Sequence, residues 1–141
     1  MAETGGKSPL DDEIEALISG GNTGSLISGG GIGRSPGQVS VEFQVDRDFP
    51  LLSLVSMIAP SPDWFVGVHD VALFENGQWV DEKVVDLHAY DAGTDDGETY
   101  VASNAATTPQ GQITRIAAPS PLDVDGVVAP FGTFTIRRMN P

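Results

Sequence analysis

An Asn-Gly pair in the middle of the chain limits the fold more than any other short segment. Asn76-Gly77 lies between two extended apolar segments, residues 64–74 and 79–90, and Asn-Gly is the strongest short-range signal for a tight β-hairpin. The two segments are therefore predicted to run antiparallel. Because a hairpin returns the chain to the end of the sheet from which it departed, the loops before residue 64 and after residue 90 are predicted to lie at the same end.

Those two loops carry the most informative side chains of the sequence. The first contains Asp63 directly after Pro62, and the second, residues 91–97, contains Asp91 and Asp95. Pro and Gly fix sharp turns, which hold these carboxylates at the loops. Two interpretations of the residues stay open. Each Asp caps its own turn through the backbone, or the loops together supply oxygen ligands to a hard cation such as calcium.

The rest of the chain predicts an all-β fold. Residues 38–46 alternate apolar and polar side chains, as in a strand with one solvated face, and residues 49–59 are apolar enough for a central strand that is packed on both sides. A short strand is predicted at residues 112–117 and a final one at residues 133–139. Val84, Val85 and Leu87 are the predicted buried residues of the strand after the hairpin. With 17 Gly and 10 Pro to form turns, the sequence favours an antiparallel β-sandwich.

One short helix is predicted before the strands. Ser8 is the expected N-cap, Pro9 occupies the first helical position, and Gly20 with Gly21 ends the helix. Residues 1–7 are predicted to form a disordered leader. Residues 8–141 are then a single domain, in which residues 20–37 form an irregular loop. The apolar face of the helix consists of Leu10, Ile14, Leu17 and Ile18.

Composition narrows the classes of function. The chain has 141 residues, 20 acidic against 7 basic side chains and a formal charge of -13, which argues against nucleic-acid binding because that affinity comes mainly from Lys and Arg. It contains no Cys, so disulfides, zinc-thiolate sites and cysteine nucleophiles are excluded. No apolar run approaches the roughly 20 residues of a membrane-spanning helix.

Two motifs resemble a known family. Residues 57–67 read MIAPSPDWFVG and residues 89–95 read AYDAGTD, and at this separation they are similar to the spondin domain, in its bacterial-type form. The resemblance is densest over residues 39–110. It implies a C2-like β-sandwich that is secreted or displayed at the cell surface, has no enzymatic activity and acts in cell or matrix adhesion. It also implies that Asp63, Asp91 and Asp95 are ligands of Ca²⁺.

The sequence departs from the family in two respects. Animal members carry cysteines that are absent here, and the strand that usually precedes the helix is not found in the sequence. Three explanations stay open for the missing strand: the sequence is a truncated form, the first 37 residues take its place, or another chain donates a strand to an exposed edge. The last explanation predicts self-association, as in a subunit of a surface fibre.

The remaining candidates have simpler interpretations. Asp96 and Glu98 are near enough to join a metal site or to act as charges at its rim. Trp64 is expected to be a structural wedge beside the first loop. His69 and His88 have no second ligand at metal-binding spacing, so each is interpreted as a surface or strand histidine.

An alternative function is a metal-dependent hydrolase that uses Asp63 and Asp91 as paired carboxylates. No nucleophile or oxyanion motif accompanies them, so a binding module is the favoured class. Its expected partners are calcium and an unknown extracellular protein or glycan. Calcium is also expected to bridge this acidic surface to an acidic partner, such as a carboxylated glycan or an anionic lipid headgroup.

Overall fold

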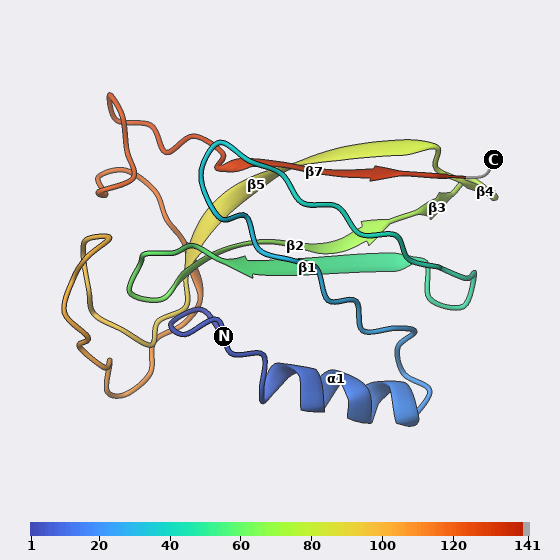
Figure 1. Ribbon diagram of the computed structural model, residues 1–141, viewed down its shortest axis with the longest axis horizontal. Coiled ribbons are helices and arrows are strands. Elements are labelled where there is room, and N and C mark those ends of the chain that lie inside the picture. Colours follow the sequence, from blue (N-terminus) through green and yellow to red (C-terminus); the bar gives the residue numbers. More distant parts are fainter. Residues whose placement is uncertain (140–141) are drawn as a thin grey trace. The chain divides into compact units, whose positions relative to one another are not determined.

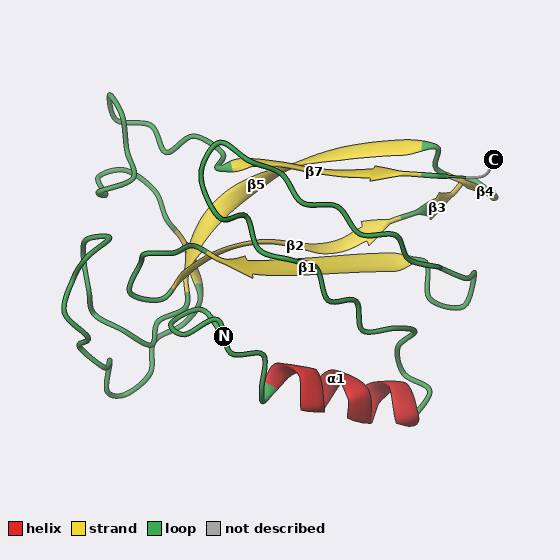
Figure 2. Cartoon of the chain, in the orientation of Figure 1, coloured by secondary structure: helices red, strands yellow, loops and turns green. Residues whose placement is uncertain are grey.

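The computed structural model describes residues 1–139, which form two compact units. One unit consists of residues 1–6 and the chain from Leu51 onward, and the other of Lys7–Pro50. The first contains all the strands and the second the helix (Figures 1 and 2). Among the described residues, no helix has the length and apolarity needed to cross a membrane.

The sheet unit is built around strand β5, Glu82–Asp91, whose two halves have different partners. Its first half pairs antiparallel with β7, Gly132–Arg137, from Glu82 to Leu87. Its second half pairs with β2, Trp64–Ala72, and at its last two residues also with β6, Thr114–Arg115. β5 therefore passes from one layer to the other, with β1 and β2 on one side and β7 on the other (Figure 1). The predicted all-β, sandwich-like fold is confirmed.

Strand β1, Leu51–Met57, lies at the edge of the sheet, since the strand order is β1-β2-β5-β6. The segment was predicted to be a central strand. That position is wrong, and only one face of β1 is covered, because Leu51 and Val55 are 54% and 46% exposed whereas Leu52 and Leu54 are half-buried. Continuous apolarity predicts a strand, but it does not say which neighbours the strand will have.

The core of the sheet unit is small and centred on β2. The side chains of Trp64, Val66, Val71 and Ala89 are between 1% and 8% exposed. Val66 lies opposite Ala89 in the β2–β5 register, so the buried side chains of the two strands meet. Val84, Val85 and Leu87 were predicted to be buried. Val84 is 55% exposed, whereas Val85 and Leu87 are half-buried, because side chains alternate along a strand and Val84 lies on the opposite face.

The predicted hairpin is confirmed. Phe74–Glu75 (β3) pairs with Gln78–Trp79 (β4), with Asn76 and Gly77 as the two turn residues. Both turn residues have positive φ, 53° and 82°, as a type I′ turn requires. The prediction that the acidic loops share one end is also confirmed, because Trp64 at the start of β2 lies opposite Asp91 at the end of β5.

Helix α1, Leu10–Ser19, forms where the sequence predicted it and ends at Gly20. Ser8 does not cap it: the residue at the N-cap position is Pro9, no side chain caps the end, and the Ser8 hydroxyl instead donates to Asp12 Oδ2 at 2.8 Å. Acidic residues in the first turn favour the helix through its dipole. Gly21, with φ of 70°, provides the left-handed residue that turns the chain away.

The predicted strand at residues 38–46 is absent. The segment forms neither a strand nor a helix, and Val39 and Val41 are 48% and 46% exposed. Alternation predicts which side chains would face a core, but a strand also needs a neighbour for its backbone groups. Residues 1–6 belong to the sheet unit, where Ala2 is 9% exposed. The disordered leader over residues 1–7 and the domain boundary at residue 8 stay predictions.

Candidate functional site

Asp63 connects the two acidic loops. Its carboxylate is fully buried, and Oδ2 accepts hydrogen bonds from the backbone N–H of Thr94 at 2.7 Å and of Asp95 at 3.1 Å. The Thr94 hydroxyl donates to the same oxygen at 3.2 Å. A carboxylate that accepts several donors is a strong acceptor and holds them in place. Asp63 therefore fastens the second loop to the first.

The other oxygen of Asp63 has no such partner. Oδ1 is buried and accepts no hydrogen bond from any described residue. Buried polar atoms are almost always paired, so each exception calls for an explanation such as a bound ion or water. Since a buried carboxylate oxygen without a partner is costly, a cation at this position would compensate for its lost hydration.

Asp91 ends β5 and begins the second loop. Its Oδ1 accepts the backbone N–H of Gly93 at 2.7 Å, an Asx turn that starts the loop. Burial raises the pKa of Asp91 above its ordinary value, and the hydrogen bond from Gly93 opposes this. The nearby negative charges of Asp63, Asp96 and Asp95 raise the pKa further. An additional positive charge would therefore be favourable at this end of the sheet.

Asp95 stabilises the loop in which it lies. The side chain is 6% exposed, Oδ1 accepts the N–H of Gly97 at 2.8 Å, and Oδ2 accepts the N–H of Ala105 at 3.1 Å. These two bonds close a turn and pin the far side of the loop. Asp95 thus has the turn chemistry that the sequence left open as the simpler interpretation.

Two glycines allow the second loop to pack this tightly. Gly93 has φ of 71°, and a Cβ there would lie 2.7 Å from the carbonyl carbon of Gly111. A Cβ on Gly97 would lie 2.6 Å from Pro62 Cγ and 2.9 Å from Asp95 Oδ1. Neither position has room for a side chain.

The structure brings Asp63, Asp91 and Asp95 to one end of the sheet, but it does not arrange them around a common centre. Within residues 1–139, no group of three or more His, Cys, Asp or Glu side chains is disposed to hold a metal ion. Of the two charges that the sequence placed near the site, Asp96 accepts the Thr107 hydroxyl at 2.7 Å and is exposed. Glu98 is exposed as well.

The other aromatic and histidine predictions agree with the structure. Trp64 is 3% exposed and meets the ring of Tyr100 edge-on, with 5.2 Å between ring centroids, so it is a core residue beside the first loop. His69 is almost fully exposed and lies 3.5 Å from Asp70. His88 Nδ1 lies 2.9 Å from Arg115 Nη2 on the surface of β5 and β6.

Sequence reasoning missed two residues that build the site. Thr94 supplies both a backbone and a hydroxyl donor to Asp63. Ser61 shapes the first loop, because its hydroxyl donates to Ile58 O and accepts the N–H of Trp64 at 3.1 Å. The signal for Ser61 was available, since a Ser three residues before a strand commonly bonds the backbone. The Thr94 contact spans 31 residues, so no local pattern could have revealed it.

Comparison with known proteins identifies the class to which this domain belongs. The Spondin_N family model matches residues 1–141. Spondin-2 of Rattus norvegicus is 42% identical over 122 residues, which are 86% of this chain and 37% of that protein. Spondin-2 of Homo sapiens is 40% identical over 122 residues with the same coverage. Spondin-1 of Xenopus laevis is 40% identical over 108 residues, which are 71% of this chain and 13% of that protein.

The chain therefore belongs to the spondin N-terminal domain family, as its two motifs indicated. It spans little more than a third of the length of the spondin-2 proteins that it matches, 37%. Spondins are secreted proteins of the extracellular matrix, and the predicted secreted or cell-surface location is confirmed on that basis. They are not known enzymes, and an extracellular adhesion role fits the family.

Proposed function

We propose that this domain is a non-enzymatic extracellular adhesion module that binds one calcium ion between its acidic loops. The observation that carries the calcium site is the buried Oδ1 of Asp63, which accepts no hydrogen bond from the described residues. Asp91 supports it as the second ligand, because burial and neighbouring carboxylates raise its pKa. A bound cation would relieve both costs at once.

The donor set fits a calcium ion if the backbone and water complete it. Calcium takes about six to eight oxygen ligands in flexible geometry, and carboxylates alone do not supply that number here. Asp95 is the third proposed ligand, and its side chain would have to turn toward the ion, because the three carboxylates do not surround a common centre in the structure. Both of its oxygens already accept an N–H, but each carboxylate oxygen has a second lone pair that remains available.

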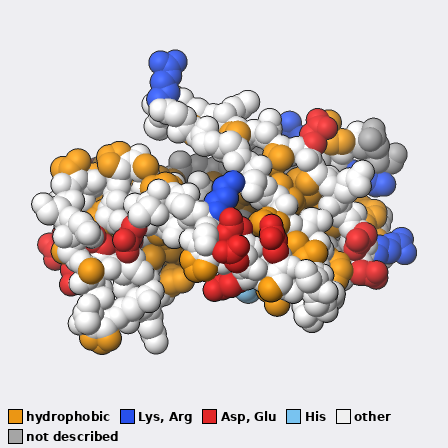
Figure 3. Space-filling model, turned by 60° about the horizontal axis from the view of Figure 1, so that its bottom comes forward, with side chains coloured by type: hydrophobic (Ala, Val, Ile, Leu, Met, Phe, Trp, Pro, Cys, Tyr) orange, Lys and Arg blue, Asp and Glu red, His pale blue; other side chains and the backbone are white. Residues whose placement is uncertain are grey.

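Calcium also explains how so acidic a surface would adhere to an acidic partner. The chain has a formal charge of -13, and acidic side chains are visible at several places among the apolar ones in Figure 3. Such a surface repels carboxylated glycans and acidic proteins at long range. A bound divalent cation with an open coordination position would bridge the domain to a carboxylate on the partner.

Thermal unfolding of the purified domain in EDTA and in saturating CaCl₂, followed by calorimetry, tests the site. Saturation should raise Tm, because a ligand at a hundred times its Kd stabilises the fold by about 2.7 kcal/mol. Asp91→Asn should abolish this increase, since the amide keeps the Gly93 hydrogen bond but lacks the charge. Asp86→Asn, an exposed position on β5, removes the same charge elsewhere and should respond to calcium as the unaltered domain does.

Two outcomes would refute the calcium site. One is a Tm that is the same in CaCl₂ and in EDTA. The other is an equal calcium response in Asp91→Asn and Asp86→Asn, which would show that calcium acts through overall charge. Hydrolysis of glycoside or phosphoester substrates that disappears in Asp63→Asn would favour the metal-dependent hydrolase instead.

A second candidate function is self-assembly through strand addition at β1. It is favoured by the edge position of β1, with Leu51 and Val55 about half exposed, because such an edge is a template for another chain. Light scattering should then show oligomers that grow with concentration, and Val55→Lys should reduce them. A strict monomer at high concentration rejects this candidate.

A further inference from the structure

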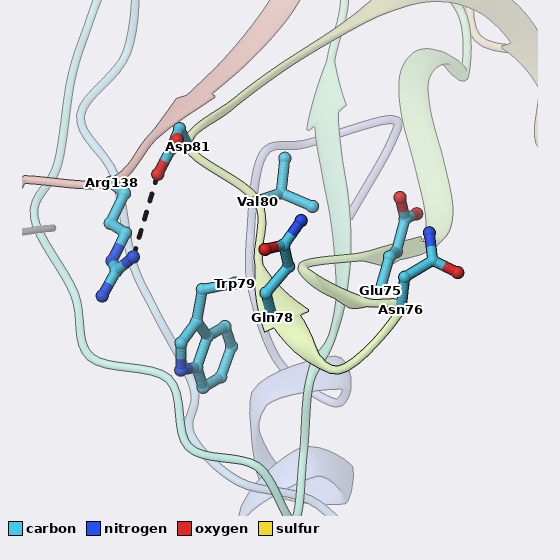
Figure 4. Close-up of a pocket in the computed structure, with 7 residues that line it drawn as sticks. All are labelled: Glu75, Asn76, Gln78, Trp79, Val80, Asp81 and Arg138. Carbon is cyan, nitrogen blue, oxygen red and sulfur yellow. Dashed lines mark ion pairs between the residues drawn. The ribbon is translucent and has the colours of Figure 1, made fainter.

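The β3–β4 hairpin borders a hollow at the end of the sheet unit away from the acidic loops. The hollow has a volume of about 350 Å³ and is lined by the hairpin, by Asp81 and by Arg138 from the segment after β7 (Figure 4). Small-molecule sites occupy about 300–1,000 Å³. The hollow is therefore large enough for a small ligand, and it lies outside the loops that we propose to bind calcium.

The backbone around the hollow and the ring of Trp79 are held by local contacts. Trp79 meets the ring of Phe74 edge-on, with 5.2 Å between centroids, and Val80 N donates to Leu73 O at 2.9 Å. Arg138 N donates to Asp81 O at 2.9 Å, which ties the chain after β7 to the base of the hairpin. A site whose walls are already ordered loses little entropy when a ligand binds.

The charges around the hollow are balanced. Arg138 Nη1 lies 3.8 Å from Asp81 Oδ1 (Figure 4), and Lys83 pairs with Glu75. Lys83 also donates to the carbonyl of Ala72 at 3.0 Å. Both carboxylates at the hollow thus have a cation partner. This differs from the acidic loops, where no Lys or Arg among the described residues pairs with Asp63, Asp91 or Asp95.

The charged and polar groups that line the hollow favour one class of ligand over the others. An anion would meet Glu75 and Asp81, and a cation would have to compete with Lys83 and Arg138 for them. A wholly apolar ligand would cover the polar groups of the hollow without satisfying them, which costs free energy. A neutral ligand with many hydroxyls avoids all three penalties, because each hydroxyl both donates and accepts.

We propose that this hollow binds a neutral saccharide, with the C–H face of a sugar ring against the indole of Trp79. The amide of Gln78 and the ends of Asp81 and Arg138, which lie on the Trp79 side of the hollow (Figure 4), provide donors and acceptors for the ring hydroxyls. The C–H face is the apolar side of an otherwise polar sugar ring, and the indole provides an apolar surface on which it can pack. The site is independent of the calcium proposal and does not need the ion.

The test is NMR and calorimetric titration of the metal-free domain with four neutral disaccharides: cellobiose, lactose, mannobiose and N,N′-diacetylchitobiose. At least one should shift the indole N–H signal of Trp79 while leaving that of buried Trp64 in place. Glucuronate and glucosamine, each carrying a charge, should bind at least about ten-fold more weakly than glucose, the neutral monosaccharide of the same size.

Four variants locate the binding. Trp79→Ala should weaken it at least about ten-fold, whereas Trp79→Phe, which keeps an aromatic face, should stay within about three-fold of the unaltered domain. If Trp79→Ala fails to fold, Gln78→Ala tests the hollow instead, because this exposed residue beside the turn can be replaced without loss of the Phe74–Trp79 pair. It should weaken binding. Tyr100→Ala removes an aromatic ring at the acidic end instead and should bind as before.

Three results overturn the proposal. The first is that none of the four disaccharides shifts the Trp79 signal at millimolar concentration. The second is that Gln78→Ala and Tyr100→Ala both bind as the unaltered domain does, which places the ligand elsewhere. The third is that glucuronate or glucosamine binds as tightly as glucose, which rejects the ligand class.

Discussion

The loops at the two ends of the sheet unit are held in place by different kinds of interaction. At the acidic end, Asp63 is fully buried and its hydrogen bonds reach 31 residues along the chain to Thr94. At the hairpin end, Asn76 and Gly77 make a local turn between adjacent strands. The acidic end depends on tertiary contacts, whereas the hairpin end depends on the backbone preferences of two residues.

A pair of glycines makes this difference measurable. Gly93 at the acidic end has φ of 71° and Gly77 at the hairpin has φ of 82°, so both adopt a left-handed backbone that disfavours other residues. A Cβ on Gly93 would overlap the backbone of Gly111, but a Cβ on Gly77 would meet no atom within 4 Å. Only packing separates the two positions.

The largest predicted effect is that of Gly93→Ala. The left-handed backbone costs about 1–2 kcal/mol for a residue with a Cβ, and overlap with Gly111 backbone adds about 1–3 kcal/mol. We expect the free energy of unfolding in urea to fall by about 3 kcal/mol, which for a domain of this size is a large share of the total. A loss below about 1 kcal/mol would show that the loop rearranges freely and that its tight packing is unimportant.

Asp63→Ala is predicted to cause the second largest loss in the free energy of unfolding. It leaves the N–H groups of Thr94 and Asp95 without their acceptor, and an unsatisfied buried group costs about 1–3 kcal/mol. We expect a loss of about 2 kcal/mol in EDTA, measured by urea unfolding. Asp86→Ala on the exposed side of β5 is the control and should stay within about 0.5 kcal/mol. Equal effects of the two would mean that Asp63 does not hold the loops together.

Gly77→Ala should cost only about 1 kcal/mol, because it carries the backbone penalty without the overlap. The comparison with Gly93→Ala therefore isolates packing at the acidic end. Urea unfolding of both variants side by side gives the difference. If Gly77→Ala costs as much as Gly93→Ala, backbone conformation alone decides both positions.

The smallest effect concerns pH. Burial raises the folded-state pKa of Asp91 above its unfolded value of 3.8, so the folded state binds more protons between the two values. Stability in EDTA should therefore decrease as pH rises through the folded pKa of Asp91. Asp91→Asn should remove this decrease and be slightly more stable than the unaltered domain at neutral pH in EDTA. Thermal unfolding of both proteins from pH 3 to 7 tests this, and identical pH profiles would contradict it.

The fold was predicted best where a local signal and a tertiary partner coincide. Asn76-Gly77 specified its hairpin, and the antiparallel return from Trp64 to Asp91 followed from it. The alternating residues 38–46 show the limit, because they have strand periodicity but no strand forms. Alternation describes one chain segment, whereas a strand also requires the backbone of another.

The candidate site was predictable in location but not in detail. The sequence placed Asp63, Asp91 and Asp95 at one end of the sheet, and the structure confirms that location. It did not distinguish their roles. Asp95 turns both oxygens toward backbone N–H groups, whereas Asp63 keeps one buried oxygen without a partner. That distinction depends on side-chain orientation and burial, which spacing along the chain does not encode.

The sequence by itself determined the β-rich class, the hairpin, the helix and the two acidic loops, because each depends on the conformational preferences of a few neighbouring residues. The tertiary structure alone decided that β1 lies at an edge, that β5 is shared between two layers and that Val84 is exposed. Those outcomes depend on which segments pair across long stretches of chain. Pairing is fixed by the collective burial of side chains, and no single segment carries that information.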